Sequence, residues 1–253
     1  MRYKTVPVKN ITRLSSAGDA LMHRSRGLPG MGLIYGETGY GKSTATAWFV
    51  NQCDGVYVRA QRVWSPSSML AAISRELGID PRGSCAQRAE AITQSLAQSG
   101  RPLFVDEANY ITRAEDMTDT LRDLHDMTSV PVVLIGTDRI NLSIKHRKQL
   151  TGRISQWVEF GPCDEEDARL VTDALCEVEI GDDLLARLHG EARGAIRLLV
   201  VGLAQLEAHA RARGLKRMSD ADWKAGRRFF VGEAPAPAAE PDKVRKLHAA
   251  GGH

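Results

Sequence analysis

The sequence has no long hydrophobic run. No apolar segment approaches the roughly eighteen residues that a helix needs to cross a bilayer. The first residues, Met1 to Thr5, also lack the apolar stretch of a secretory signal peptide. We therefore expect a soluble protein of the cytoplasm with no membrane partner.

Cysteine and net charge are also low. The four cysteines, Cys53, Cys85, Cys163 and Cys176, form no CxxC pair and have no histidine at ligand spacing. This pattern argues against a zinc site or a disulfide framework and predicts reduced, mostly packed thiols. A net charge of +3 at pH 7 permits nucleic acid binding without requiring it, because such binding depends on clustered charge.

A length of 253 residues suits one large domain or two small ones, and the 43% of hydrophobic residues is enough for a core. Short apolar runs predict strands at 32–35, 56–59, 103–106, 132–136 and 154–160. Helical patterns precede or separate them at 10–24, 42–52, 66–77, 85–98 and 116–127, with Gly78 and Gly100 as stop signals. This alternation predicts an α/β fold with a parallel sheet covered by helices.

The pattern changes to helix only after Asp164, which is a candidate N-cap. Helices are predicted over 165–178, 182–189, 194–213 and 219–230. The last residues are rich in proline and alanine and then basic, which predicts a disordered tail. We therefore expect an N-terminal lead and helix at 1–28, an α/β core at 29–162, a small helical domain at 163–231 and a tail at 232–253.

A glycine-rich loop carries the strongest chemical signal. Residues Gly36 to Ser43 match G-x-x-x-x-G-K-[ST] and lie between a predicted strand and a predicted helix. In such a loop, backbone NH groups surround phosphate, the lysine reaches the outer phosphates and the serine ligates magnesium. The nucleotide-contacting residues expected here are Gly36, Glu37, Thr38, Gly39, Tyr40, Gly41, Lys42, Ser43 and Thr44.

Two other strands end in residues that suit a triphosphate site. Asp106 would hold magnesium, directly or through water, and Glu107 would polarise the attacking water; the alternative is an acidic helix start. Thr137 follows the strand at 132–136 and either orients that water, contacts the outer phosphate or caps a turn. Ligands bind at such strand ends in open parallel sheets.

Arg153 and Arg197 are distinguished by their positions. Arg153 precedes the fifth predicted strand, and Arg197 lies at the start of a helix in the C-terminal part. A guanidinium suits the charge on a transferring phosphoryl group; the alternative for each residue taken alone is a surface residue or a structural ion pair.

These features together resemble the AAA+ ATPase family over roughly residues 10 to 230. The resemblance implies an AAA+ P-loop core with a small C-terminal helical lid, ATP and Mg²⁺ as cofactors, and a site shared between subunits. It assigns Thr137 as sensor 1, Arg153 as the arginine finger acting on the neighbouring subunit's nucleotide, and Arg197 as sensor 2. Tyr40 departs from the residue usual before Gly-Lys.

Within that family the chain resembles the DNA transposition regulators of the MuB and TnsC group. The segments that carry this resemblance are 9–14, 30–36, 106–109 and 192–199. It implies a non-sequence-specific, ATP-dependent filament on duplex DNA that delivers target DNA to a transposase, in the host cytoplasm if phage-encoded. The alternatives are a replication initiator or helicase loader, and a secretion or signalling switch with a protein partner.

Two basic segments are candidates for DNA contact through the core. Arg59 and Arg62 lie near Trp64 after the second predicted strand, and Lys145 and Lys148 form a denser run. Either pair could neutralise phosphates without reading sequence. The alternatives are a packed Trp64, a solvated basic helix face, and a role of Lys145 and Lys148 at the subunit interface.

Overall fold

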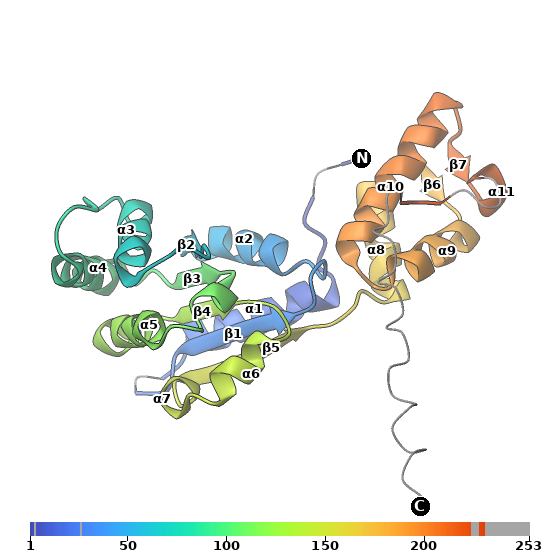
Figure 1. The fold of residues 1–253 in the computed structure, drawn as a ribbon. Coiled ribbons are helices and arrows are strands. Elements are labelled where there is room, and N and C mark those ends of the chain that lie inside the picture. The colour runs from blue at the N-terminus through green and yellow to red at the C-terminus, as the bar shows by residue number, and fades with distance from the viewer. Residues whose placement is uncertain (3, 26, 224–227, 231–253) are drawn as a thin grey trace, which may run out of the picture.

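A computed structural model describes residues 1–230 except for 3, 26 and 224–227, so the predicted tail at 232–253 lies outside the described residues. Its central feature is a five-stranded sheet in the order β2-β3-β4-β1-β5, with every pairing parallel. The strands are β1 (Met31–Gly36), β2 (Val56–Arg59), β3 (Leu103–Asp106), β4 (Val132–Ile135) and β5 (Ile154–Phe160). Figure 1 shows the sheet between two layers of helices.

Successive strand residues pack into different cores, as the pleat of a strand requires. On β1, Leu33 belongs to one buried cluster and Ile34 to the other. On β3, Leu103 and Val105 face one side while Phe104 faces the opposite side. Both faces are therefore covered, which explains why these strands appear as continuous apolar runs.

Helices on the two faces come from different parts of the chain. α1 (Lys9–Met22) and α2 (Lys42–Gln52) pack on one face. The other face carries α3 (Pro66–Glu76), α4 (Cys85–Ser99), α5 (Glu115–Thr128), α6 (Ile140–Lys145) and α7 (Lys148–Thr151). Side-chain caps set two helix starts, because Ser65 accepts from the Ser68 amide and Ser84 from the Gln87 amide.

The C-terminal part is a group of helices at the end of the sheet toward which the strands point (Figure 1). It contains α8 (Glu165–Leu175), α9 (Asp182–Ala192), α10 (Ile196–Ala212) and α11 (Asp220–Trp223). The Asp164 side chain accepts a hydrogen bond from the Asp167 amide, which confirms the predicted N-cap.

The prediction that this part is helix only was wrong. β6 (Glu179–Ile180) lies between α8 and α9, and β7 (Arg217–Met218) lies between α10 and α11. The two strands pair in parallel. α8 ends at Leu175 rather than at 178 because the chain turns out of the helix to enter β6. No helix among the described residues is both long and apolar enough to span a membrane.

Candidate nucleotide-binding site

The predicted glycine-rich loop joins the carboxyl end of β1 to the start of α2. Gly39 and Gly41 have φ angles of 95° and 88°, which side chains disfavour. A Cβ at Gly41 would also lie 3.1 Å from Ile196 Cγ2. Glycine at these two positions therefore gives the loop its curvature and lets the C-terminal helices approach it.

Lys42 is the first residue of α2, and its ammonium is held by the loop itself. Nζ donates to the carbonyl oxygens of Gly36 at 2.8 Å and Glu37 at 2.7 Å. Tyr40 OH donates to the Glu37 carboxylate at 3.3 Å, so this unusual tyrosine forms part of the loop. The first residue of α2 thus directs its ammonium back to the start of the loop.

Charged groups of both signs surround Lys42. Burial lowers the pKa of Lys42, the nearby Asp106, Glu107 and Asp138 carboxylates raise it, and the Arg197 guanidinium lowers it. These five groups come from the start of α2, the carboxyl ends of β3 and β4 and the residues that follow them, and the start of α10. The fold therefore gathers two cations and three carboxylates at one edge of the sheet, where open parallel sheets bind ligands.

The Asp106 carboxylate is buried and held at both oxygens. Asp106 is only 3% exposed. Oδ1 accepts from the Glu107 amide at 2.8 Å, and Oδ2 accepts from Tyr57 OH at 2.7 Å. Burial and the Asp106 carboxylate raise the pKa of the Tyr57 phenol well above its ordinary value.

Glu107 is less buried and has an unusual backbone. Its φ angle is 53°, in the left-handed region that few residues other than glycine adopt. Its carboxylate oxygen Oε1 accepts a hydrogen bond from Arg59 Nη2 at 3.2 Å. Arg59, predicted as a DNA contact, therefore lies beside the predicted catalytic carboxylate.

Thr137 follows β4 at the same edge and is fixed by Asn109. The Asn109 side-chain oxygen accepts from the Thr137 amide at 3.0 Å and from its hydroxyl at 3.1 Å. Asn109 belongs to the short 3₁₀ turn η1 (Ala108–Tyr110) after β3. One amide thus links the segment that carries Asp106 to the segment that carries Thr137.

The start of α10 docks directly on the glycine-rich loop. The Arg197 amide donates to the Gly39 carbonyl at 3.1 Å, and Arg197 acts electrostatically on Lys42. The Arg197 side chain is exposed. The structure therefore brings this predicted residue to the same site as Lys42.

Arg153 lies at the opposite end of the sheet. Its carbonyl accepts from the amide of Met31, the first residue of β1. The glycine-rich loop starts five residues further along that strand, about 17 Å away at roughly 3.3 Å per residue. Arg153 is thus separated from the loop of its own chain by the length of the strand.

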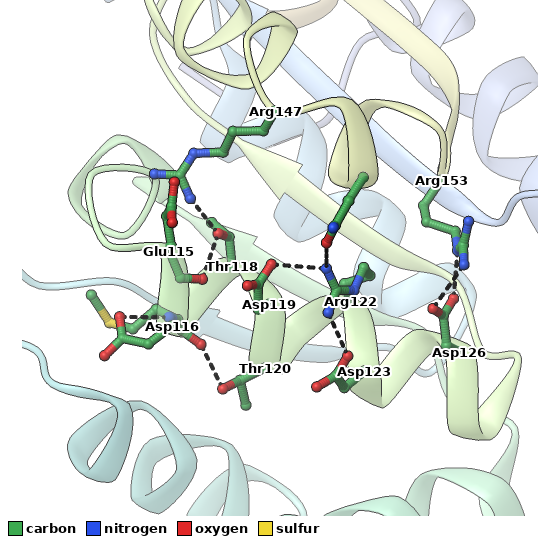
Figure 2. Close-up of polar contacts among 12 residues, drawn as sticks. Glu115, Asp116, Thr118, Asp119, Thr120, Arg122, Asp123, Asp126, Arg147 and Arg153 are labelled. Carbon is green, nitrogen blue, oxygen red and sulfur yellow. Dashed lines mark hydrogen bonds and ion pairs between the residues drawn. The ribbon is translucent and has the colours of Figure 1, made fainter.

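Figure 2 shows that the Arg153 side chain is directed to α5. Nε and Nη2 donate to the two carboxylate oxygens of Asp126 at 2.7 and 3.1 Å. On the same helix, Arg122 donates to the carboxylates of Asp119 and Asp123. Two contacts connect α5 to the segment around α7: Arg122 donates to the Gln149 side-chain oxygen at 2.6 Å, and Arg147 donates to the Thr118 hydroxyl. This network fixes the segment around α7 against α5.

The predicted DNA contacts come from two separate segments of the chain. Arg59 is the last residue of β2 and Arg62 follows it, whereas Lys145 and Lys148 lie in α6 and α7. Arg62, Lys145 and Lys148 are exposed. Their part in DNA binding stays a prediction.

The donor set fits a magnesium-bound nucleoside triphosphate. Left-handed glycines shape the loop, Lys42 and Arg197 provide positive charge, and Ser43 and Asp106 provide the oxygen ligands that magnesium prefers. Ser43 and Thr44 are exposed at the start of α2. These residues could hold the phosphates and the metal together.

Sequence reasoning missed Tyr57, Asn109 and Asp138. Asn109 and Asp138 lie within two positions of Glu107 and Thr137, so proximity to a predicted residue was the available signal. Tyr57 lies in a different strand from Asp106. Only the pairing of β2 with β3 brings the two side chains together.

Part of the chain matches a known protein family. Residues 25–142 match a family described as AAA domain, a range that includes the glycine-rich loop, Asp106, Glu107 and Thr137. No curated protein matches the chain.

Several solved structures share the fold. The ORC2 protein of Aeropyrum pernix, in ADPNP-ADP complexes, has a TM-score of 0.68 at 18% identity, covering 88% of this chain and 68% of its own. The Aeropyrum pernix ORC1 protein in complex with DNA gives 0.63 at 15%, covering 84% and 62%. The RuvB Holliday junction branch migration motor of Thermotoga maritima gives 0.60 at 18%, covering 86% and 67%.

The chain thus spans 62% of the length of the ORC1 structure, and at these identities the likeness concerns the fold. The family match covers the strand ends and the loop where the charged groups gather. Residues 25–142 match an AAA domain, and the chain shares the fold of the ORC1, ORC2 and RuvB structures.

Proposed function

We propose that this protein binds ATP with magnesium at the glycine-rich loop and hydrolyses it to ADP and phosphate. The observation that carries the proposal is the electrostatic grouping of Asp106, Glu107, Asp138 and Arg197 around Lys42. A site for a neutral ligand would not need such a concentration of charge. Phosphates with a divalent cation match both signs at once.

Each residue has a distinct part in this reaction. Lys42 would exchange its carbonyl partners for the outer phosphates, and Ser43 and Asp106 would hold the metal. Glu107 accepts a proton from the attacking water as general base, and Thr137 orients that water or the outer phosphate. Bound magnesium supplies positive charge for the developing negative charge on the phosphates.

The proposal extends to self-association, with Arg153 serving the nucleotide of a neighbouring subunit. Support comes from its distance from the loop of its own chain and from its side-chain exposure of 45%. A guanidinium held near the surface is available to a second molecule once it leaves Asp126. The resulting filament or ring would hydrolyse ATP only when assembled.

We further propose that the assembled protein binds duplex DNA without sequence specificity and delivers target DNA to a transposase. The resemblance of segments 9–14, 30–36, 106–109 and 192–199 to transposition regulators supports this role. One protein with the same fold was solved in complex with DNA. Arg59, Arg62, Lys145 and Lys148 are the candidate phosphate contacts.

A replication initiator or helicase loader is the second candidate. The ORC1 and ORC2 structures and the Cdc6p structure of Pyrobaculum aerophilum share the fold, the last with a TM-score of 0.62 at 17% identity. The two candidates differ in the protein that the assembly recruits. Stimulation of ATP hydrolysis by a transposase supports the first, and retention of a replicative helicase supports the second.

DNA binding with and without ATP analogue tests the shared part of the proposal. The expected result is binding to random-sequence duplex only with nucleotide, with affinity that falls steeply as salt rises. Electron microscopy of the same samples separates filament, ring and monomer. Nucleotide-independent, salt-insensitive binding would contradict the proposal.

A further inference from the structure

We infer that Tyr57 is a positioning residue for the metal-binding carboxylate of Asp106, an inference that rests on the proposed ATPase function. Tyr57 lies on β2, the strand next to β3, which ends at Asp106. Its hydroxyl donates to Asp106 Oδ2 at 2.7 Å. Among the described residues, the Tyr57 hydroxyl bonds to Asp106 and makes no hydrogen bond to the glycine-rich loop, so its effect on the site is transmitted through Asp106.

The hydrogen bond fixes the orientation of the carboxylate. Asp106 Oδ1 accepts the Glu107 amide and Oδ2 accepts Tyr57 OH, so one donor holds each oxygen. A carboxylate with a hydrogen bond at each oxygen cannot rotate about the Cβ–Cγ bond without breaking one of those hydrogen bonds. Each oxygen still has one lone pair free for a metal or its water.

The burial of Asp106 makes the hydrogen bond from the Tyr57 phenol hard to replace. Asp106 is 3% exposed, so water cannot readily replace a lost donor. A buried carboxylate that loses one partner retains a large desolvation cost. Groups that hydrogen-bond to metal-ligating side chains typically change metal affinity by about 10- to 100-fold when removed.

The Tyr57→Phe variant tests the inference because it removes only the hydroxyl. Binding of a fluorescent ATP analogue is measured in excess EDTA and across a Mg²⁺ titration, so the readout does not depend on turnover. We expect the affinity in EDTA to stay within about twofold of wild type. The additional affinity conferred by Mg²⁺ should fall by about 10-fold or more, with a higher Mg²⁺ midpoint.

Tyr35→Phe is the matched control. Tyr35 is a partly buried tyrosine on β1 that interacts with Asn141 and Glu159 rather than with Asp106. It should keep the wild-type response to Mg²⁺. A double-mutant cycle with Asp106→Asn gives a second measurement, in which the Tyr57→Phe effect on Mg²⁺ should largely disappear.

The possible outcomes separate this inference from the proposed function. A wild-type Mg²⁺ response in Tyr57→Phe overturns the inference alone. An equal loss of affinity with and without Mg²⁺ also overturns it, because that result indicates general damage to the fold. Absence of nucleotide binding by the wild-type protein overturns the proposed function and this inference together.

Discussion

Arg59 Nη2 lies 3.2 Å from Glu107 Oε1, so a residue predicted to contact DNA is paired with the predicted general base. The two come from the carboxyl ends of neighbouring strands, where Arg59 stands opposite Asp106. The Arg59 side chain is 66% exposed and that of Glu107 is 32% exposed. A phosphate that approaches the exposed guanidinium therefore competes with the glutamate for it.

Replacing Arg59 by alanine should raise ATP turnover in the absence of DNA and weaken its response to DNA. The freed Glu107 carboxylate is more available to water. An exposed ion pair is worth up to about 1 kcal/mol, which corresponds to a factor of about five in rate. Arg62→Ala, which removes an exposed arginine of the following loop, is the control for turnover without DNA. Unchanged basal turnover in Arg59→Ala would contradict the prediction.

Glu107→Gln should keep ATP binding and lose turnover. Glutamine preserves the size of the side chain but cannot accept a proton, and positioned general bases contribute about 10²- to 10⁴-fold. Lys42→Ala should instead lose ATP binding, because the charge opposite the outer phosphates is removed. Equilibrium nucleotide binding and phosphate release distinguish the two variants, and parental turnover by Glu107→Gln would show that another group is the base.

Arg153→Ala should bind ATP normally and hydrolyse it poorly. An arginine finger contributes about 10³- to 10⁵-fold in related phosphoryl transfers. Mixing Arg153→Ala with Lys42→Ala should restore part of the activity, since each variant retains the half site that the other lacks.

Asp126→Ala separates catalysis from structure at this position. It breaks the ion pair shown in Figure 2 but leaves the guanidinium in place. Its turnover should therefore stay at or above the wild-type value. A loss equal to that of Arg153→Ala would mean that the ion pair, rather than the free guanidinium, is what the reaction needs.

Much of the sheet could be predicted because buried parallel strands are apolar runs bounded by polar residues. The bounds 56–59, 103–106 and 154–160 agree with β2, β3 and β5. The helices α6 and α7 have six and four residues, too few for an apolar periodicity to appear. β6 and β7 have two residues each and depend on contacts between distant segments.

Some residues of the candidate site could be predicted from the sequence and others could not. The glycine-rich loop and the Asp106-Glu107 pair are recognisable because their chemistry requires adjacent residues. Tyr57 and Arg59 act across a strand pairing, and the order of strands in the sheet is not encoded in any local pattern. Their proximity to Asp106 and Glu107 became visible only with the register of β2 against β3.

His125 provides a prediction about stability rather than catalysis. It lies in α5 with its ring buried, where Nε2 accepts from the Gly30 amide at 3.2 Å and Nδ1 faces the Val130 carbonyl at 2.7 Å. Burial lowers the pKa of His125, the bond to Val130 and the Asp126 carboxylate raise it, and Arg24 and Arg153 lower it. The net direction is down, which favours the neutral ring in the folded state.

The sign of the pH dependence follows from that direction. Below its ordinary pKa near 6.5, the histidine of the unfolded chain binds a proton that the folded chain excludes, so acidification favours unfolding. The contribution is fully present above about pH 6.5 and is lost as the pH falls toward the folded pKa, by at most about 1.4 kcal/mol per pH unit. Chemical denaturation between pH 5 and 8, a range of about three units around this value, measures it.

His125→Gln should remove this part of the pH dependence, because the glutamine oxygen can accept the Gly30 amide and does not titrate. The variant loses some stability at every pH, so the informative quantity is the slope and not the absolute value. His146→Gln, which replaces an exposed histidine after α6, is the matched control. His125→Gln removes one titratable group, the buried imidazole. If the variant retains the wild-type slope between pH 5 and 6.5, the acid sensitivity comes from other groups.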